Sequence, residues 1–277
     1  MTKPVLGIVR GRVHRERSRL VDGGGPRAVI LSAGRGSRLL PLTEAKPKCL
    51  IEIEGKSILE WQIDALVQAG VHQSTVVVGF GADQVIAMAQ ELTTPQVRIR
   101  TIVNPLFDVA DNLVSCWTAR EEMHTDFLLL NGDTLFEPAV VERLLASRYA
   151  PVTVAMTRKS DYDEDDMKVR CDGNVLRKIG KGLPLDETDG ESIGMLLLRG
   201  TGAAEFRRRL EAAIDNPQAT NWYYLSIINE MAAEGMVRVA PVDGLQWAEV
   251  DFLHDLDRAQ TVVEAWANRP AAMLRRA

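Results

Sequence analysis

The stretch that decides the fold is RAVILSAGRGSRLLPLTEAKPKCLIEI, residues 27–53. It begins with an apolar run, residues 28–31, and such a run is typical of a strand buried on both faces of a parallel sheet. A loop that contains Gly34 and Gly36 follows the run. Because open α/β sheets bind ligands at the carboxyl ends of their strands, this loop is expected to lie at a binding crevice.

The composition of the loop favours a polyphosphate ligand. Gly34 and Gly36 have no Cβ, so backbone N–H groups can approach phosphate oxygens closely. Arg38 and Lys48 bring two positive charges to the same expected binding crevice. Two common phosphate motifs are absent, because no Walker lysine follows the glycines and Leu39 stands where the dinucleotide fingerprint needs a third glycine. A G-x-G pair alone would also fit an ordinary tight turn.

The longer pattern is more specific. It resembles the signature of the sugar-phosphate nucleotidyltransferase superfamily, G-x-G-x-R-x-x-P-x-T followed by P-K-x-L, and this chain meets it at Gly34, Gly36, Arg38, Pro41, Thr43, Pro47, Lys48 and Leu50. The resemblance implies a Rossmann-like three-layer α/β/α fold with a mostly parallel mixed sheet. It also implies that Arg38 and Lys48 are catalytic and that the nucleotide is bound by Ser32, Ala33, Gly34, Gly36, Ser37, Arg38 and Lys48.

The order of predicted elements agrees with an α/β fold. In the first half, strands at 28–31, 74–78, 97–103 and 127–130 alternate with helices that begin near residues 56, 82 and 112. The second half predicts strands at 152–157, 167–171, 175–179, 193–199 and 237–241, and helices at 202–214, 221–234 and 254–267. We therefore expect one domain, residues 26–270, with a nucleotide-binding half (26–150) and an acceptor-binding half (151–270).

Residues 1–25 differ from the rest of the chain. Five arginines crowd the segment, and three glycines, residues 23–25, end it. This pattern predicts a basic extension joined by a glycine linker, although residues 5–9 could instead add a strand to the fold or to a partner. The segment has neither a long apolar region nor a small-residue cleavage site, so we do not expect a secretory signal.

Two aspartates are candidate metal ligands. Asp133 follows the buried run 127–130 in the sequence Asn-Gly-Asp, which could also be a simple turn cap. A carboxylate at the end of a sheet strand, facing a polyphosphate, is a natural ligand for Mg²⁺. In the resembled superfamily, a G-D pair and a later E-V-D-x-x-x-D-L segment supply the metal aspartates. Residues 132–133 and 249–256 match these motifs, which implies that Asp133 and Asp251 are catalytic Mg²⁺ ligands, while Asp255 is expected in the first turn of a helix.

The implied reaction is attack of an acceptor oxygen on the α-phosphorus of a nucleoside triphosphate, with release of pyrophosphate. A phosphate acceptor is already anionic at neutral pH, so no general base is required. The sequence indeed offers no convincing catalytic His, Ser or Cys constellation. Catalysis would depend on positioning and on neutralisation of charge.

The acceptor half resembles the subgroup that makes CDP-activated small alcohols, which includes bacterial choline-phosphate and phosphonate cytidylyltransferases. The segments D-M-K-V, I-G-K and G-E-S-I-G-M carry this likeness and imply that Lys168, Lys181 and Glu191 bind the acceptor. Lys168 could instead protect an edge strand. The segment 111–115 carries the same likeness and implies nucleotide-base contacts from Asn112 and Ser115, with Gly79 and Gly81 beneath the base. Trp222 and Tyr223 could form a cation–π cage for the acceptor or pack in the core.

Composition limits the remaining possibilities. The chain has 277 residues, 46% hydrophobic and 26% charged, and its formal net charge of −5 does not favour a nucleic-acid partner. No apolar run approaches membrane-spanning length, and the three cysteines lack disulfide or zinc spacing. We therefore expect a cytoplasmic, Mg²⁺-dependent cytidylyltransferase that uses CTP and a small phosphate or phosphonate acceptor, and a homo-oligomer is possible. Two alternatives remain open: a sugar-1-phosphate nucleotidyltransferase that uses UTP, dTTP or GTP, and a non-catalytic nucleotide-binding regulatory module.

Overall fold

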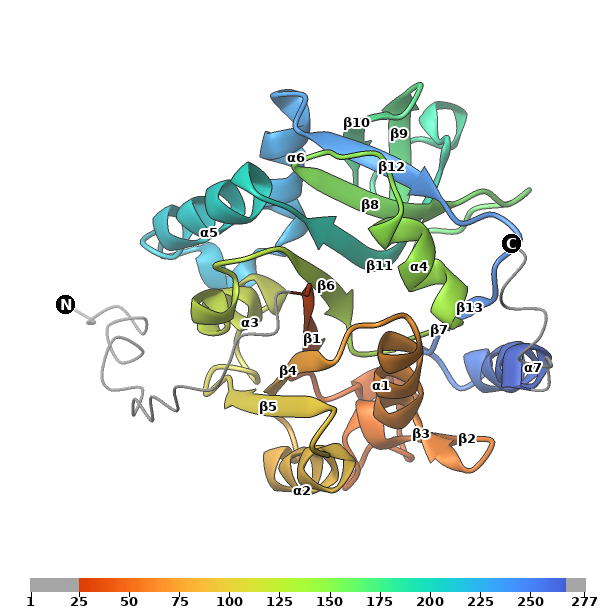
Figure 1. Ribbon diagram of the computed structural model, residues 1–277. Coiled ribbons are helices and arrows are strands. Elements are labelled where there is room, and N and C mark those ends of the chain that lie inside the picture. Colours follow the sequence, from red (N-terminus) through yellow and green to blue (C-terminus); the bar gives the residue numbers. More distant parts are fainter. Residues whose placement is uncertain (1–24, 268–277) are drawn as a thin grey trace.

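The computed structural model describes residues 25–267 and is built around one large sheet (Figure 1). The strands of this sheet are β1 (Arg27–Ser32), β4 (Gln73–Val78), β5 (Arg98–Val103), β6 (Phe127–Asn131), β8 (Val152–Thr157), β9 (Lys168–Asp172), β10 (Val175–Ile179), β11 (Gly190–Leu198) and β12 (Val237–Pro241). They form nine strands in the order β5-β4-β1-β6-β11-β8-β12-β10-β9. The apolar run of residues 28–31 is therefore part of a central strand, as predicted.

The sheet is mixed. The strands of the first half, β5, β4, β1 and β6, are all parallel to their neighbours. Antiparallel pairing enters with β11, which lies between β6 and β8, whereas β8 and β12 are parallel. The β9–β10 hairpin extends the sheet, and β9 also pairs with the first residues of β11. The first and second halves of the described chain thus share one continuous sheet.

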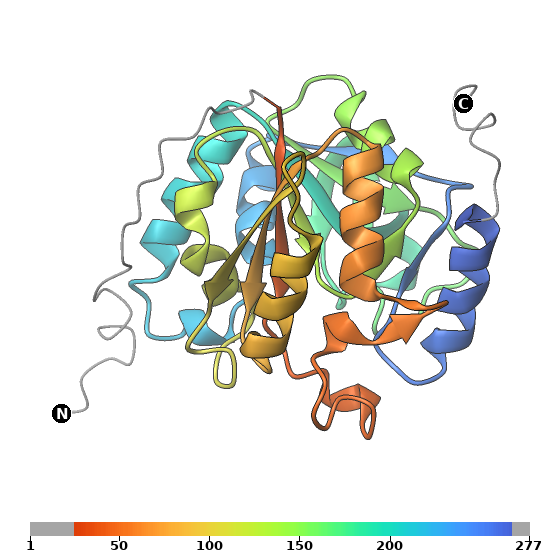
Figure 2. The same ribbon diagram turned by 60° about the horizontal axis from the view of Figure 1, so that its bottom comes forward.

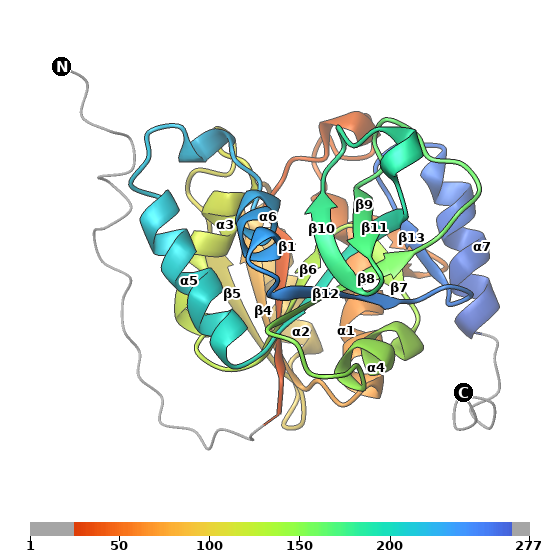
Figure 3. The same cartoon turned by 90° about the horizontal axis from the view of Figure 1, so that it is seen from above.

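Helices cover both faces of the sheet. They are α1 (Ile58–Gln68), α2 (Ala82–Leu92), α3 (Asn112–Thr118), α4 (Pro138–Leu145), α5 (Thr201–Ala213), α6 (Leu225–Ala233) and α7 (Asp255–Ala267). One core joins α3, α5 and α6 to one face, and a second core joins α1, α2 and α4 to the other. Figure 3 shows α3, α5 and α6 on one side of the strands and α1 and α4 on the other. The predicted three-layer arrangement is confirmed.

Two short ladders extend from this framework. The first joins β2 (Glu52–Ile53) to β3 (Lys56–Ser57), and the second joins β7 (Thr134–Phe136) to β13 (Trp247–Glu249). Helix α7 packs on the second ladder through a third apolar core that includes Leu135, Val250 and Val263. Figure 2 shows α7, in dark blue, at the end of the molecule away from α5, in cyan. This ladder brings residues near 250 to the carboxyl end of β6.

The structure differs from the sequence-based prediction in two places. The predicted helix 221–234 begins only at Leu225, because segment 220–224 makes hydrogen bonds to the start of α3. Strand β7 and helix α4 have no counterpart among the predicted elements, although Pro138 is a common first residue of helices. The basic extension, residues 1–25, lies outside the described residues except for its last glycine. No helix within residues 25–267 is long and apolar enough to cross a membrane.

Helix α1 connects to the loop after β6 through a buried amide. Ser57 and Glu60 form a capping box at the start of this helix. One turn later, Gln62 is 1% exposed, and its Nε2 donates hydrogen bonds to the carbonyl oxygens of Asn131 and Thr134, both at 2.8 Å. Gln62 therefore fixes both ends of the short segment that carries Asp133.

We expect Gln62→Met to lower the free energy of unfolding by about 1–3 kcal/mol, because two buried carbonyl oxygens lose their donor. Urea denaturation measures this change. The matched control is Gln68→Met on the same helix, where the side chain is exposed and the effect should stay within about 0.5 kcal/mol. Equal losses in both variants would mean that the amide does not hold this segment.

Candidate active site

The loop after β1 is folded back on itself by a glycine and a threonine. Gly36 has a φ of 66°, in the left-handed region, and a Cβ at this position would lie 3.0 Å from Cβ of Lys48. The hydroxyl of Thr43 donates a hydrogen bond of 2.7 Å to the carbonyl oxygen of Gly36. These contacts set Lys48 directly against the glycine loop. Gly36, Thr43 and Lys48 of the predicted signature therefore have a local structural reason as well as a chemical one.

Lys48 is held between two carboxylates. Its Nζ lies 2.7 Å from Oδ2 of Asp133 and 2.5 Å from Oδ1 of Asp251. Burial alone would lower the pKa of this ammonium group, but the two carboxylates outweigh burial and raise the pKa above its ordinary value. Lys48 is thus a permanent cation at neutral pH, and the structure brings three of the four predicted catalytic residues into direct contact.

Asp133 owes its position to close packing of β1 and β6. The N–H of Gly132 donates a hydrogen bond of 2.9 Å to the carbonyl oxygen of Leu31. A Cβ on Gly132 would lie 2.6 Å from that oxygen and 2.2 Å from Oγ of Ser32, so a larger residue would push the two strand ends apart. In the predicted G-D pair, Gly132 therefore allows β1 and β6 to lie close together at their carboxyl ends, and this close packing places Asp133 beside the glycine loop.

Asp251 is brought to the same place by long-range pairing. In the β7–β13 ladder Glu249 is opposite Thr134, and the N–H of Val250 donates a 3.0 Å hydrogen bond to the carbonyl oxygen of Asp133. Oδ2 of Asp255 accepts hydrogen bonds from the N–H groups of Asp251 and Phe252, at 2.8 and 2.7 Å. Asp255 is in the first turn of α7, as predicted, and there it fixes the turn that presents Asp251.

The two aspartates and Glu249 form a carboxylate cluster whose ligand oxygens all lie within 4.8 Å of one another. Glu249 faces solvent, but the protein atoms that crowd its carboxylate, together with the charges of Asp133 and Asp251, raise its pKa to about 8. Oδ1 of Asp133 is buried and has no hydrogen-bond partner among residues 25–267. A buried carboxylate oxygen without a donor, in a group of three carboxylates, fits a divalent cation such as Mg²⁺.

Arg38 connects this cluster to Asp165, in the second half of the chain. Its guanidinium group lies 3.5 Å from Oδ2 of Asp251 and 3.9 Å from Oδ1 of Asp165, and half of the side chain is exposed. The same Oδ1 of Asp165 lies 2.8 Å from Nζ of Lys181. The charge of Lys181 also acts on Glu249. Arg38, predicted to bind the nucleotide, and Lys181, predicted to bind the acceptor, therefore contact the same carboxylate oxygen, Oδ1 of Asp165.

The other two predicted acceptor residues are buried nearby. Lys168 is 3% exposed, and its Nζ donates a hydrogen bond of 3.0 Å to the carbonyl oxygen of Lys181. The carboxylate of Glu191 lies 2.9 Å from Nζ of Lys159, and burial together with a hydrogen bond to Asp166 raises its pKa to about 7. Both side chains are thus engaged with the protein, and direct contact of either with an acceptor stays a prediction.

The residues predicted near the nucleotide base lie beside the glycine loop or in α3. Gly79 and Gly81 form a bridge at the end of β4, and the intervening Phe80 N–H donates to the carbonyl oxygen of Ala33 at 3.0 Å. In α3, Oδ1 of Asn112 accepts from the N–H of Tyr224, and Oγ of Ser115 accepts from the side chain of Asn104. Base contacts from Asn112 and Ser115 stay predictions.

The aromatic segment before α6 is divided between core and surface. Tyr224 is buried, and its hydroxyl group donates a hydrogen bond of 3.3 Å to Oδ1 of Asn131. Trp222 is partly buried against the core that joins α3, α5 and α6, and its carbonyl oxygen accepts from the N–H of Leu113. Tyr223 is 53% exposed. An aromatic cage made of Trp222 and Tyr223 stays a prediction.

Sequence reasoning did not assign a role to Glu249 or Asp165. A signal existed for Glu249, because it stands two residues before Asp251 in the E-V-D segment that already matched the family motif. Asp165 is part of an acidic run, residues 161–166, which alone predicts a solvated loop. Only its contacts with Arg38 and Lys181 separate Asp165 from its neighbours.

Comparison with known families gives a match over residues 28–254 to the model described as MobA-like NTP transferase domain. The chain belongs to the MobA-like NTP transferase family. The match begins in β1 and ends just after Asp251, so it includes the glycine loop, Lys48 and all three carboxylates of the cluster. Members of this family generally use a divalent metal, in agreement with the cluster.

Individual relatives of this NTP transferase are cytidylyltransferases. The chain is 31% identical to the CMP-5'-(3-aminopropyl)phosphonate synthase of Streptomyces rubellomurinus over 81% of its own length, but this alignment spans only 37% of that relative. It is 25% identical to the CTP:phosphoglutamine cytidylyltransferase of Campylobacter jejuni, over 83% of this chain and 97% of the relative. The inositol-1-phosphate CTP transferase from T. maritima has the same fold, with a TM-score of 0.71 at 20% identity over 90% of this chain and 99% of that one.

These findings establish an enzyme of the nucleotidyltransferase type, related to cytidylyltransferases. The predicted superfamily is confirmed, and the alternative of a non-catalytic regulatory module is set aside. Such an enzyme binds a nucleoside triphosphate and a phosphate-bearing acceptor.

We expect Lys48→Met to destabilise the metal-free protein by on the order of 2 kcal/mol, because the carboxylate cluster loses its central cation. Mg²⁺ should then stabilise the variant more than it stabilises the wild type, since the ion can replace the lost positive charge. Thermal unfolding at neutral pH, in EDTA and in millimolar MgCl₂, measures both effects without any substrate.

The matched control is Lys46→Met, the same substitution two residues away. Lys46 pairs with Glu52 on the surface, where both side chains are well exposed, so its removal should change stability by less than about 1 kcal/mol. A Lys48 variant that behaves like the Lys46 variant, with no larger response to Mg²⁺, would contradict the proposed neutralisation of the cluster.

Proposed function

We propose that this enzyme transfers CMP from CTP to a small phosphomonoester or phosphonate acceptor, with release of pyrophosphate and dependence on Mg²⁺. The observation that carries the proposal is the contact of Lys48 with Asp133 and Asp251 at the glycine loop, with Arg38 beside them. A triphosphate is the ligand that suits a glycine loop, two cations and a carboxylate cluster able to hold a metal.

The nucleotide side follows from the geometry of the cluster. Asp133, Asp251 and Glu249 would hold Mg²⁺, which supplies positive charge that stabilises the phosphate oxygens in the transition state. Lys48 would then interact with the same phosphates, because its contacts with the two aspartates set its ammonium group beside the metal ligands. Arg38, half exposed at the mouth, can turn towards the triphosphate without leaving a buried charge unpaired.

On the acceptor side, we propose Lys181 as the direct ligand of the acceptor's phosphate or phosphonate. Its side chain is partly exposed and lies next to Arg38 through Asp165, so an anion bound there would be near the α-phosphate. Lys168 is buried and donates to the carbonyl oxygen of Lys181, which favours a positioning role for Lys168. Two cations at the meeting point of two anions reduce the repulsion that opposes their approach.

The chemistry needs no general base. An acceptor oxygen that is already anionic forms a bond to the α-phosphorus, while the bond from that phosphorus to the oxygen bridging to the β-phosphate breaks. The electron pair of the broken bond leaves with pyrophosphate, and no proton has to move. Lys48 and Arg38 are placed to stabilise the charge that develops on the phosphate oxygens.

Cytidine and the acceptor class are supported by the relatives. The two relatives named above are a phosphonate CMP synthase and a phosphoglutamine cytidylyltransferase. Both names combine CMP or CTP with a small acceptor that carries phosphorus. We further propose a cytoplasmic location, since the substrates are nucleotides and the described cysteines are free thiols.

A matrix of substrates tests this proposal. CTP, UTP, dTTP and GTP are each combined with aminoalkylphosphonates, phosphocholine, other small phosphomonoesters and hexose-1-phosphates, and pyrophosphate release is measured. We expect turnover with CTP and a phosphonate or small phosphomonoester. Preferred turnover of a hexose-1-phosphate with UTP, dTTP or GTP would instead assign the enzyme to the sugar-activating branch.

We expect Asp133→Asn and Asp251→Asn to reduce turnover by about 100-fold or more, because the cluster loses the charge that binds Mg²⁺. Pyrophosphate release at saturating CTP measures the loss, and circular dichroism verifies the fold. Asp257→Asn, on an exposed position of α7, is the matched control and should retain turnover. Wild-type rates in either cluster variant would refute the metal assignment.

A further inference from the structure

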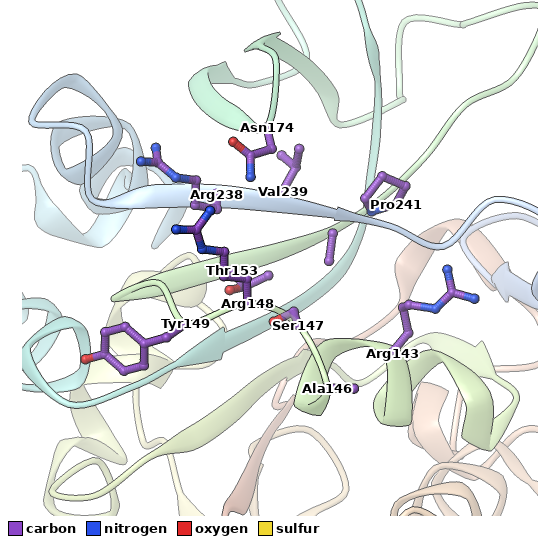
Figure 4. Close-up of a pocket in the computed structure, with 11 residues that line it drawn as sticks. Arg143, Ala146, Ser147, Arg148, Tyr149, Thr153, Asn174, Arg238, Val239 and Pro241 are labelled. Atoms are coloured by element: carbon purple, nitrogen blue, oxygen red, sulfur yellow. The ribbon is translucent and has the colours of Figure 1, made fainter.

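A cavity that shares no residue with the catalytic cluster lies over β12. Its volume is about 540 Å³, and its lining comes from α4, the α4–β8 loop, the β9–β10 turn and β12: Arg143, Ala146, Ser147, Arg148, Tyr149, Thr153, Asn174, Arg238, Val239, Ala240 and Pro241 (Figure 4). Strands β6 and β8 run in the same direction, because each is antiparallel to β11. The loop 146–151 leads into the start of β8, whereas Asp133 follows the carboxyl end of β6, so the two lie at opposite ends of the strands. The cavity is therefore separate from the active site.

The cavity is strongly basic. Three of its lining side chains are arginines, and none of the lining residues is acidic. Among residues 25–267, no carboxylate lies within 4.0 Å of the guanidinium groups of Arg143, Arg148 or Arg238. In Figure 4, Arg148 and Arg238 lie near each other on the side of Asn174, and Arg143 lies on the other side of the cavity. Positive charge is therefore present at two separated places.

The lining is held in position by the protein itself. The guanidinium group of Arg199 donates to the carbonyl oxygens of Ser147 and Arg148, at 3.2 and 2.9 Å, and lies over the ring of Tyr149. On the opposite wall, the N–H of Val239 donates a hydrogen bond of 2.9 Å to the carbonyl oxygen of Asn174. Arg199 also adds a further positive charge behind the loop. A ligand would thus meet a formed site and would not have to order a loop.

The uncovered face of the sheet explains why the cavity exists. Helix α6 packs against β10 and β12 on one face, and α4 packs against β8 and β11 on the other. Arg238 and Ala240, two residues apart on β12, face the side of α4, where Ala240 joins the core of that face. Beside α4 the sheet is open, and three arginines line the opening together with small and apolar residues such as Ala146 and Pro241.

We propose that this cavity binds a small molecule with two separated anionic groups, phosphates or carboxylates. Its volume is in the range of small-molecule sites, and guanidinium groups on both sides suit an elongated dianion. Three arginines without acidic partners repel one another, and this is notable in a chain with a net charge of −5. An anion that binds here relieves that repulsion. The inference does not depend on which acceptor the active site uses.

Calorimetric titration of the full-length protein with fructose 1,6-bisphosphate and, in a second arm, with citrate tests the proposal and distinguishes phosphate from carboxylate ligands. Both titrations contain EDTA, so that the metal site does not contribute. We expect one binding site with a micromolar Kd for at least one probe. Arg148→Gln and Arg238→Gln should each weaken binding by on the order of tenfold, because each removes a charge-assisted hydrogen-bond donor.

Two control variants make the result specific. Arg98→Gln removes an exposed arginine from β5, at the far edge of the sheet, and Lys48→Ala removes the central cation of the active site. Neither should change the affinity for the probe. Loss of binding in Lys48→Ala would move the ligand to the active site and overturn the proposal. A millimolar Kd that is the same in all variants would mean that the three arginines are only solvated surface residues, and this result would overturn the proposal as well.

Discussion

The ion-pair contact of Lys48 with Asp133 and Asp251 is the interaction on which the site depends. It joins residues 85 and 203 positions apart in the chain, from the loop after β1, the end of β6 and the end of β13. A single cation between two carboxylates neutralises charges that would otherwise repel one another in a partly buried place. A divalent metal would meet the same electrostatic demand, and Lys48 could then pair with the phosphate oxygens of a triphosphate, so the arrangement of these three residues agrees with the chemistry proposed for the enzyme.

Around this contact, the fold provides supports that do not react themselves. Gln62 holds the backbone on both sides of Asp133, and Asp255 holds the backbone at Asp251. The β7–β13 ladder, covered by α7, fixes the distance between the two aspartates. Positioning of this kind matters because transfer between two anions depends on geometry and on preorganised charge more than on a reactive side chain.

Charge is distributed over the molecule in two separate arrangements. At the active site, cations and carboxylates alternate: Lys48 and Arg38 contact aspartates, and Asp165 lies between Arg38 and Lys181. In the cavity over β12, three arginines lack such partners among the described residues. The first arrangement suits a substrate that brings its own metal and phosphates, because the carboxylates can then pair with the metal and the cations with the phosphates. The second suits a ligand that supplies negative charge alone.

Local patterns of sequence were sufficient for the framework and for part of the site. The apolar run 28–31, the glycine loop with Lys48, and the buried strand before Asp133 predicted a Rossmann-like fold and its binding edge, because strand periodicity and the absence of a Cβ act within a few residues. The contribution of Asp251 came from resemblance to a family motif, not from periodicity.

Only the tertiary structure decided the contacts between distant segments. Glu249 joins the cluster because β13 pairs with β7, and Asp165 gains partners from two halves of the chain. Lys168 turns inward to the carbonyl oxygen of Lys181. Thr134 and Glu249 pair across the two strands although they are 115 residues apart in the sequence, and pairing over such a distance leaves no local periodicity in the chain. For this physical reason these residues could be assigned only after folding brought them together.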